Sequence, residues 1–244
     1  MDRIVNYKVI SNTKINSSTY MIELKGPTEW IQSGKFLNIQ VPNKYLKRPM
    51  SVYDWNKSSL KVLYKLIGEG TKILSTIKPN QSLEILTDLG NTYTPSKNKK
   101  QLIVCGGCGM GSVYKLAKQL SSQHIDVTII VGFKTKADVF VLNEWKKVCK
   151  NLVITTDDGS VGFKGTVVDA INKYKLNNLY YYTCGSINLM KAVYKCMKSE
   201  GQLSLEARMG CGFGACMGCT IETKHGPKRI CADGPIFNSK ELLW

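Results

Sequence analysis

The sequence predicts a protein of mixed class, β followed by α/β, with an antiparallel β-barrel, a parallel α/β domain and a short third segment. Three observations lead to this. Short β-rich runs fill residues 1–98, strands alternate with helical patterns over 99–203, and cysteine and glycine dominate 204–244. Antiparallel and alternating β/α patterns are typical of separate folding units. We therefore expect three regions with these boundaries.

The first region contains six short runs rich in β-branched and aromatic residues. Turn residues such as Gly26–Pro27, Ser33–Gly34 and Pro79–Asn80 separate them. Several short strands with regular turns predict an antiparallel barrel or sandwich. The expected strands are Tyr7–Ile10, Tyr20–Leu24, Phe36–Val41, Ser51–Tyr53, Leu60–Ile67 and Leu83–Leu86.

The second region follows a polar linker, Pro95–Lys100, and changes rhythm. An apolar strand, Gln101–Cys105, runs into a glycine-rich turn, and apolar residues at helical spacing follow. Strands that alternate with helices predict a Rossmann-like parallel sheet. The remaining expected elements are strands at Val127–Gly132, Leu152–Thr155 and Leu179–Thr183 and helices at Val141–Cys149, Val167–Tyr174 and Ile187–Lys198.

The third region has little periodicity, so we expect something other than a core of its own to hold it together. Four of the nine cysteines fall in it, and the total is odd. Structural disulfides are rare in reducing compartments, which favours a metal site over a disulfide-linked fold.

Composition narrows the class of protein. The chain has 244 residues, a net charge of +16, no apolar run of membrane-spanning length and no signal-peptide pattern at its start. The charge is spread along the chain as lysine, without a basic stripe interleaved with aromatic residues. We therefore expect a cytoplasmic protein with a Lys-rich solvated surface that binds neither nucleic acid nor membrane.

The strongest local signal is the spacing of the four late cysteines. Cys211, Cys216 and Cys219 form a C-x4-C-x2-C loop rich in glycine, and Cys231 follows. This is the spacing of plant-type [2Fe–2S] sites, in which four thiolates hold the cluster and backbone N–H groups bond the sulfurs. Zinc sites prefer two closely spaced pairs, so a zinc knuckle is the less favoured alternative.

A second signal lies in the first region, where an arginine and a hydroxyl stand near one strand end. A guanidinium of this kind can bind a flavin pyrophosphate, and a glycine permits close approach of the backbone. Taken alone, such residues also arise by structural accident. They are Arg48, Pro49, Met50 and Ser51, then Leu63, Tyr64 and Lys65, then Gly70 and Thr71.

A third signal is the turn between the first strand and helix of the second region, which contains Gly107, Gly109 and Gly111. N–H groups at a helix N-terminus suit a dinucleotide phosphate. The turn does not match G-x-G-x-x-G, so a tight structural turn is the alternative. Cys105 and Cys108 lie at this turn, and we interpret both as packing residues.

A fourth signal, Cys184-Gly185, stands where a later strand ends and a helix begins. Ligands bind at this edge of parallel sheets. Cys184 either faces a nicotinamide ring or is a small buried residue.

Together, in this order, the motifs resemble the ferredoxin–NADP reductase superfamily over nearly the whole chain. Within it, the stretch Leu205–Cys219, followed by Arg229–Phe237, is similar to the cluster-binding tail of the electron-transfer subunits of class B dihydroorotate dehydrogenases. Ser112-Val113 and Ser186 depart from that pattern, where relatives often have Ala-Pro and Pro.

The resemblance implies three cofactors. FAD is held in the barrel by the flavin motifs, NAD in the second domain by the Gly107–Gly111 turn and Cys184-Gly185, and one [2Fe–2S] cluster by the four cysteines. It also implies a catalytic subunit that carries FMN and oxidises dihydroorotate, in a heterotetramer of two copies each. Electrons would run from FMN through the cluster and FAD to NAD⁺ for pyrimidine biosynthesis.

Two other readings stay open. One is the flavin and iron–sulfur subunit of a ferredoxin- or sulfide-type NAD(P)H oxidoreductase, and the other is a zinc-stabilised binding module without redox activity. Lys134 and Lys136 follow the second strand of the nucleotide domain, where a cation could meet a 2′-phosphate. The residues therefore leave NAD and NADP open, and the resemblance favours NAD.

Overall fold

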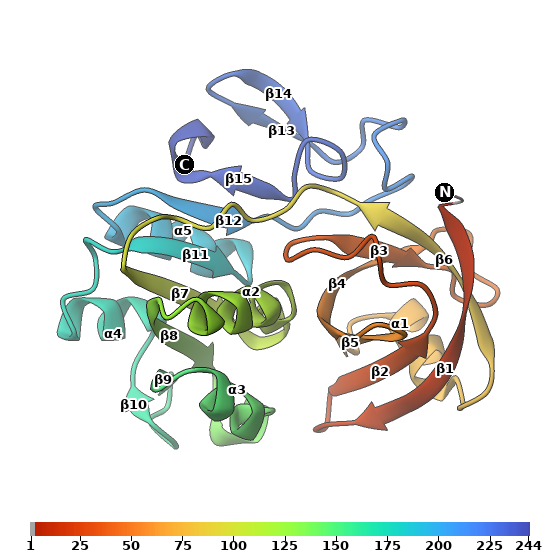
Figure 1. Ribbon diagram of the computed structural model, residues 1–244, viewed down its shortest axis with the longest axis horizontal. Helices are drawn as coiled ribbons and strands as arrows, with labels where there is room; N and C mark the ends of the chain where they lie inside the picture. Colours follow the sequence, from red (N-terminus) through yellow and green to blue (C-terminus); the bar gives the residue numbers. More distant parts are fainter. Residues whose placement is uncertain (1–2) are drawn as a thin grey trace.

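The computed structural model describes residues 3–244, which begin with a closed six-stranded antiparallel barrel (Figure 1). Its strands close in the order β1-β2-β5-β4-β3-β6, which confirms the predicted barrel. They are β1 (Ile4–Lys14), β2 (Thr19–Lys25), β3 (Phe36–Ile39), β4 (Arg48–Trp55), β5 (Ser59–Lys65) and β6 (Ser82–Leu89).

A helix that the sequence analysis did not predict, α1 (Glu69–Thr76), connects β5 to β6. The Thr71 hydroxyl accepts hydrogen bonds from the backbone N–H groups of Ile67 and Gly68, at 3.0 and 3.2 Å. These bonds satisfy donors just ahead of the helix and fix its first turn. The N-terminus of α1 therefore has a defined position at one end of the barrel.

The second region forms a seven-stranded sheet in the order β10-β9-β8-β7-β11-β12-β15. All of its pairs are parallel except β12 with β15, which is antiparallel, and the predicted Rossmann-like domain is confirmed. The strands are β7 (Lys100–Gly106), β8 (Asp126–Phe133), β9 (Asn151–Thr156), β10 (Phe163–Lys164), β11 (Tyr180–Cys184), β12 (Gly201–Ser204) and β15 (Ile236–Asn238).

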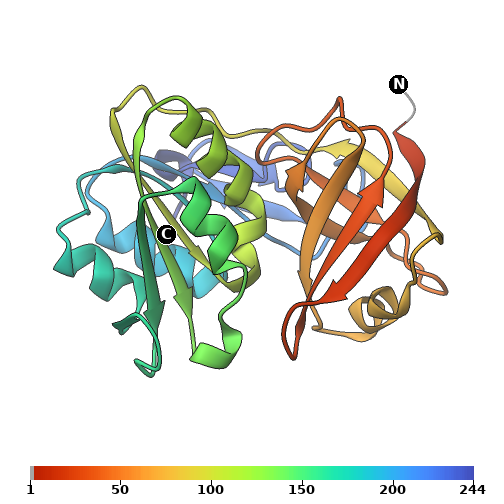
Figure 2. The same cartoon turned by 60° about the horizontal axis from the view of Figure 1, so that its bottom comes forward.

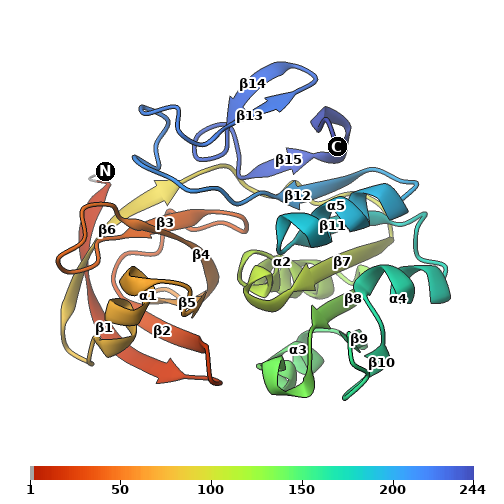
Figure 3. The same ribbon diagram turned by 180° about the vertical axis from the view of Figure 1, so that it is seen from behind.

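Helices cover both faces of this sheet, as parallel strands buried on both sides require. One pair covers the face in front in Figure 1, and the other pair comes forward in Figure 3. The first pair is α2 (Met110–Ser122) and α3 (Leu142–Val148), and the second is α4 (Val167–Lys173) and α5 (Ile187–Cys196). Within residues 3–244, none of the helices combines the length and the apolar character that crossing a bilayer requires.

The third region is less independent than its lack of periodicity indicated. It contains a hairpin, β13 (Thr220–Thr223) and β14 (Gly226–Arg229), and then adds β15 to the edge of the main sheet. Cys219, Cys231 and Phe237 are buried in one core with residues of α5 and of the barrel. The segment is thus held by a shared hydrophobic core as well as by its cysteines. Strand β12 spans the boundary that we predict between residues 203 and 204.

The barrel and the α/β domain form two lobes that lie side by side (Figure 2), joined in part through strand β4 and helix α2. The Tyr53 ring stacks on Tyr114 with centroids 4.2 Å apart. Next to it, Asp54 accepts hydrogen bonds from the ammonium groups of Lys115 and Lys118, at 2.8 and 2.9 Å. This contact connects the strand that begins with Arg48 to the helix that follows the glycine turn.

We expect Asp54→Ala to lower the free energy of unfolding by about 2 kcal/mol near neutral pH, because it removes two charge-assisted hydrogen bonds. Burial acts to raise the pKa of Asp54, but the bonds from Lys115 and Lys118 outweigh it and hold the pKa below its usual range. A carboxylate with a lowered pKa stabilises the fold above the pKa of the unfolded chain, about 4, and loses this effect as pH falls through its folded pKa.

The difference in free energy of unfolding between the wild type and Asp54→Ala should therefore be largest at neutral pH and should disappear in acid. Urea unfolding curves recorded from neutral pH down to about pH 3 measure it. Asp157→Ala, in the exposed loop after β9, is the control and should change little. A deficit that stays constant over the whole range would contradict the ionic origin of the effect.

Candidate functional site

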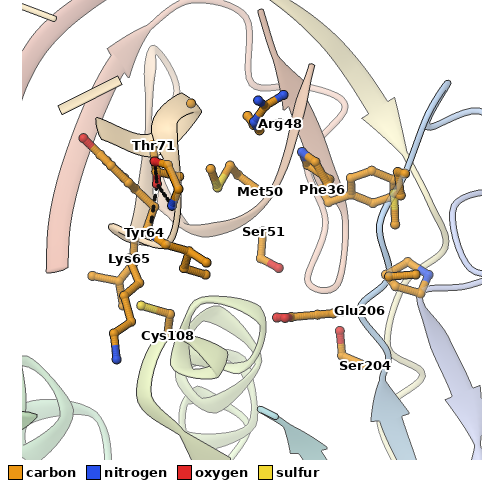
Figure 4. Close-up of a pocket in the computed structure, with 18 of the residues that line it drawn as sticks. Phe36, Arg48, Met50, Ser51, Tyr64, Lys65, Thr71, Cys108, Ser204 and Glu206 are labelled. Atoms are coloured by element: carbon orange, nitrogen blue, oxygen red, sulfur yellow. Dashed lines mark hydrogen bonds between the residues drawn. The ribbon is translucent and has the colours of Figure 1, made fainter. Parts of the chain in front are cut away.

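A cavity of about 450 Å³ lies between the barrel and the rest of the chain (Figure 4). Volumes of this size are typical of small-molecule and cofactor sites. All nine residues of the predicted flavin motifs line it: Arg48, Pro49, Met50, Ser51, Leu63, Tyr64, Lys65, Gly70 and Thr71. The barrel topology brings them together, because β4 and β5 are antiparallel and the start of one meets the end of the other.

Arg48 and the N-terminus of α1 form one end of this cavity. A Cβ added to Gly70 would lie 2.4 Å from Arg48 Nε, so only glycine lets the guanidinium pack over the helix start. Gly68, Glu69 and Thr71 of the same turn also line the cavity. A guanidinium beside a helix N-terminus is a site for an anion such as a phosphate group.

The opposite wall comes from residues that the sequence analysis did not select. They are Phe36, Cys108, Ser204 to Ala207, Met209 and Pro235, whereas Ile67 lines the cavity beside Gly68 and Thr71. Only the position of Leu205–Met209 directly before the first cysteine of the motif could have signalled this wall. Cys108 packs against a hydrophobic core cluster, as interpreted from the sequence, and this half-buried side chain also lines the cavity.

Glu206 is the acidic group of that wall. Its side chain points into the cavity toward Ser51, which belongs to the opposite wall (Figure 4). Glu206 is exposed at the cavity, but the protein around it partly desolvates the carboxylate and so raises the pKa of Glu206. The cavity therefore has a cationic end at Arg48 and a carboxyl group near its middle.

The glycine turn lies against the flavin motif and the Cys184-Gly185 edge at the same time. A Cβ on Gly109 would lie 2.4 Å from the Cys184 carbonyl oxygen, and one on Gly111 would lie 3.8 Å from Ser51 Cβ. Gly107 has a φ of +51°, in the left-handed region that glycine accommodates. The glycine turn and the Cys184-Gly185 edge, both predicted to bind the nucleotide, thus adjoin each other, and the turn reaches the cavity through Cys108.

The Cys184 side chain itself is fully buried and is not part of the cavity wall. Burial raises the pKa of this thiol. These observations favour the alternative of a small buried residue, which leaves the backbone of Cys184-Gly185 as the part that faces the turn.

The two departures from the family pattern have structural roles in this chain. The Ser112 hydroxyl donates to Ser204 Oγ at 2.9 Å and lies 3.2 Å from the Tyr93 hydroxyl, all three being buried. Ser186 caps α5 by accepting a hydrogen bond from Leu189 N at 3.3 Å. Each hydroxyl thus forms a hydrogen bond with another residue of the chain.

The four late cysteines form two hydrogen-bonded pairs. Cys211 N donates to Cys216 Sγ at 3.5 Å, and Cys216 N donates back to Cys211 Sγ at 3.4 Å. In the second pair, Cys231 N donates to Cys219 Sγ at 3.4 Å. Among residues 3–244, no three His, Cys, Asp or Glu side chains gather around a point suited to one metal ion.

The two pairs differ in their surroundings. Cys216 is exposed and Cys211 partly so, whereas Cys219 and Cys231 are buried. Burial acts to raise the pKa of Cys211, but hydrogen bonds from the backbone N–H groups of Cys216, Phe213 and Ala215 lower it to about 6. Burial and the adjacent Cys219 raise the pKa of Cys231 to about 12, a preference that a metal cation reverses.

Comparison with known proteins bears directly on these features. A family model described as the iron–sulfur cluster binding domain of dihydroorotate dehydrogenase B matches residues 206–243. The dihydroorotate dehydrogenase B (NAD(+)) electron transfer subunit of Fusobacterium nucleatum is 36% identical, covering 98% of this chain and 98% of its own length. That of Clostridium acetobutylicum is 34% identical, covering 97% and 96%.

Among solved structures, the NADH-dependent reduced ferredoxin-NADP oxidoreductase superposes with a TM-score of 0.90 at 26% identity, over 98% of this chain and 90% of that one. A ferredoxin NADP⁺ reductase from Neisseria gonorrhoeae, with bound FAD and NADP, has a TM-score of 0.65 at 15% identity, over 80% of this chain and 91% of that one, and shares the fold. The relatives are more than 30% identical over nearly the full length of this chain, and the matched cluster domain agrees with them. The chain therefore belongs to the family of dihydroorotate dehydrogenase B electron transfer subunits.

Proposed function

We propose that this chain takes electrons from a partner subunit, which uses FMN to oxidise dihydroorotate, and passes them to NAD⁺ in the pyrimidine pathway. The observation that carries the proposal is the arrangement around one cavity. The flavin motif lies against the glycine turn at Ser51 and Gly111, and the cysteine loop lies against the barrel. Two binding sites and a cluster site therefore adjoin one another within a single chain.

FAD is the ligand that fits the cavity. The cavity volume of about 450 Å³ suits the ring of a flavin dinucleotide. The guanidinium of Arg48 and the N-terminus of α1 suit its pyrophosphate. We assign the holding of FAD to the nine flavin-motif residues. NAD is assigned to Gly107, Gly109 and Gly111 together with the Cys184-Gly185 backbone.

The donor set of the third region fits a [2Fe–2S] cluster on Cys211, Cys216, Cys219 and Cys231. Two irons with two thiolates each require two pairs of cysteines, and the chain presents two pairs. A zinc ion requires four ligands around one point instead. N–H groups already aimed at the sulfurs favour the reduced, more negative cluster and should raise its potential above that of a less hydrogen-bonded site.

When bound, a flavin exchanges electrons singly or in pairs, which lets it connect a one-electron cluster with a nicotinamide that takes a hydride. The residues of the chain bind and orient these groups. Arg48 and the N-terminus of α1 would hold the anionic part of the flavin, the glycine turn packs against Ser51 at Gly111, and the shared core excludes water from Cys219 and Cys231.

The surface around Cys216 supports contact with a partner. Phe213 and Met217 belong to the same loop and are each 53% exposed, so two large apolar side chains near Cys216 are open to a partner. We propose that the FMN subunit docks here and that the complex contains two copies of each subunit. None of the nine cysteines, all of which lie within residues 3–244, forms a disulfide, which supports a reducing, cytoplasmic location.

The test is NAD⁺ reduction by dihydroorotate, with this chain co-purified with its catalytic partner after a visible spectrum has confirmed flavin and cluster. Activity that requires both chains is expected. Phe213→Asp should weaken co-purification, whereas Tyr174→Asp, of similar exposure at the end of α4, should not. No activity with both cofactors bound and NADH still reducing the flavin would contradict this choice of partner.

A further inference from the structure

Asn38 occupies an unexpected place in the barrel. It is 1% exposed in strand β3, whose four residues are all buried. Leu37 and Ile39 point into the barrel core, so by the alternation of a strand Phe36 and Asn38 face outward. Phe36 lines the flavin cavity and also belongs to the core that contains Cys219 and Cys231. The outer face of β3 therefore separates the cavity from the cysteine segment.

The Asn38 amide touches the first turn of the cysteine loop. Its Nδ2 donates to the Cys211 carbonyl oxygen at 3.4 Å. A Cβ added to Gly212, which has a φ of +81°, would lie only 2.0 Å from that nitrogen. The missing side chain of Gly212 thus makes the space that the amide fills. Asn38 Oδ1 is buried and has no hydrogen-bond partner among the described residues.

A buried amide with one long hydrogen bond and one orphaned oxygen costs free energy compared with an apolar side chain. Leucine has a similar size and would fit the outward face of a barrel strand better. Stability of the barrel alone does not explain asparagine at this position. Its specific contact is with the backbone of Cys211 and Gly212, which suggests a role in the cysteine loop.

We propose that Asn38 is a positioning residue that docks the cluster loop on strand β3 and so fixes the separation between the Cys211–Cys216 pair and the flavin cavity. The inference rests on the proposed function, because it needs a cluster on that loop and a flavin in the cavity. Electron transfer weakens steeply with distance, so a loop that lifts off β3 loses rate even when both cofactors stay bound. Asn38 takes no part in the redox chemistry itself.

The experiment compares Asn38→Leu and Asn38→Asp with a matched control, Gln40→Leu, in the full chain. Gln40 also donates its amide to a backbone carbonyl, that of Lys44 at 2.6 Å, in the same part of the barrel. Asn38→Asp keeps the shape of the side chain but replaces the donor with a carboxylate, so it carries the test if Asn38→Leu fails to fold. The readouts are the electron paramagnetic resonance spectrum of the reduced cluster, the rate of cluster release to a chelator, and the rate at which reduced flavin passes an electron to the cluster.

We expect both Asn38 variants to bind flavin normally, to show altered resonance positions, to release the cluster about five times faster and to transfer electrons more slowly. Gln40→Leu should match the wild type in all three readouts. Spectra and rates unchanged in both Asn38 variants, or changed equally in the control, would overturn the inference while leaving the proposed function intact. A wild-type protein without acid-labile sulfide would overturn both.

Discussion

Cys216→Ser is expected to reduce electron exchange with the partner subunit by roughly two orders of magnitude or more, because it removes one of the four thiolates that a [2Fe–2S] cluster requires. Reduction of the bound flavin by NADH should be largely unchanged. The flavin cavity is built from the barrel, α1 and the stretch before Cys211, and Cys216 is exposed and not part of its wall. The measurements are stopped-flow flavin reduction by NADH and steady-state turnover with the partner.

Cys196→Ser provides the matched control for this experiment. Cys196 is a half-buried cysteine of α5 whose thiol lies 3.4 Å from Asn172 Oδ1, within the nucleotide domain. Both activities should survive this change. If Cys216→Ser instead lowered flavin reduction and partner turnover to the same extent, the two sites would not be separate as we describe them.

Arg48→Ala is expected to weaken FAD binding about 100-fold, equivalent to about 3 kcal/mol, because it removes charge-assisted bonds to a phosphate group. The cation stands over the start of α1 in contact with Gly70, so its loss leaves the helix N-terminus as the remaining anion-binding element of that end. Titration of the flavin-free protein with FAD, followed by flavin fluorescence, measures the dissociation constant.

Arg3→Ala tests whether any loss of positive charge on the barrel has the same effect. Arg3 is exposed just ahead of β1, away from the cavity wall, and its replacement should leave FAD affinity within about twofold of the wild type. Equal weakening in both variants would show that general charge, rather than the placement of Arg48, governs binding.

The flavin side of the cavity was predictable because its residues sit on neighbouring antiparallel strands with clear β patterns. The helix α1 was not, since it has only eight residues and contains Gly70 and Thr71, which are poor helix formers. The side-chain bonds of Thr71 and the packing of Arg48 override that preference. Tertiary contacts, rather than local propensity, decide this element.

Apart from the position of Leu205–Met209 just before the first cysteine, the other cavity wall has no local pattern that could have revealed it. Glu206 follows β12, a strand of four residues, and Cys108 lies in a turn where the glycines drew attention. Both reach the cavity only because the α/β domain packs beside the barrel. The cysteine spacing, in contrast, was informative, because four thiolates on one cluster impose a sequence pattern that needs no knowledge of the fold.

Strand β15 gives the third region a role in the architecture that goes beyond holding a cofactor. It pairs with β12 at Gln202, Leu203 and Ser204 and becomes the edge strand on that side of the sheet, where the edge of β12 would otherwise be uncovered. An uncovered edge of this kind invites pairing with other chains. A protein of this architecture without the cysteine segment must protect β12 in some other way. Loss of the whole segment would therefore change the edge of the sheet as well as remove the cluster cysteines.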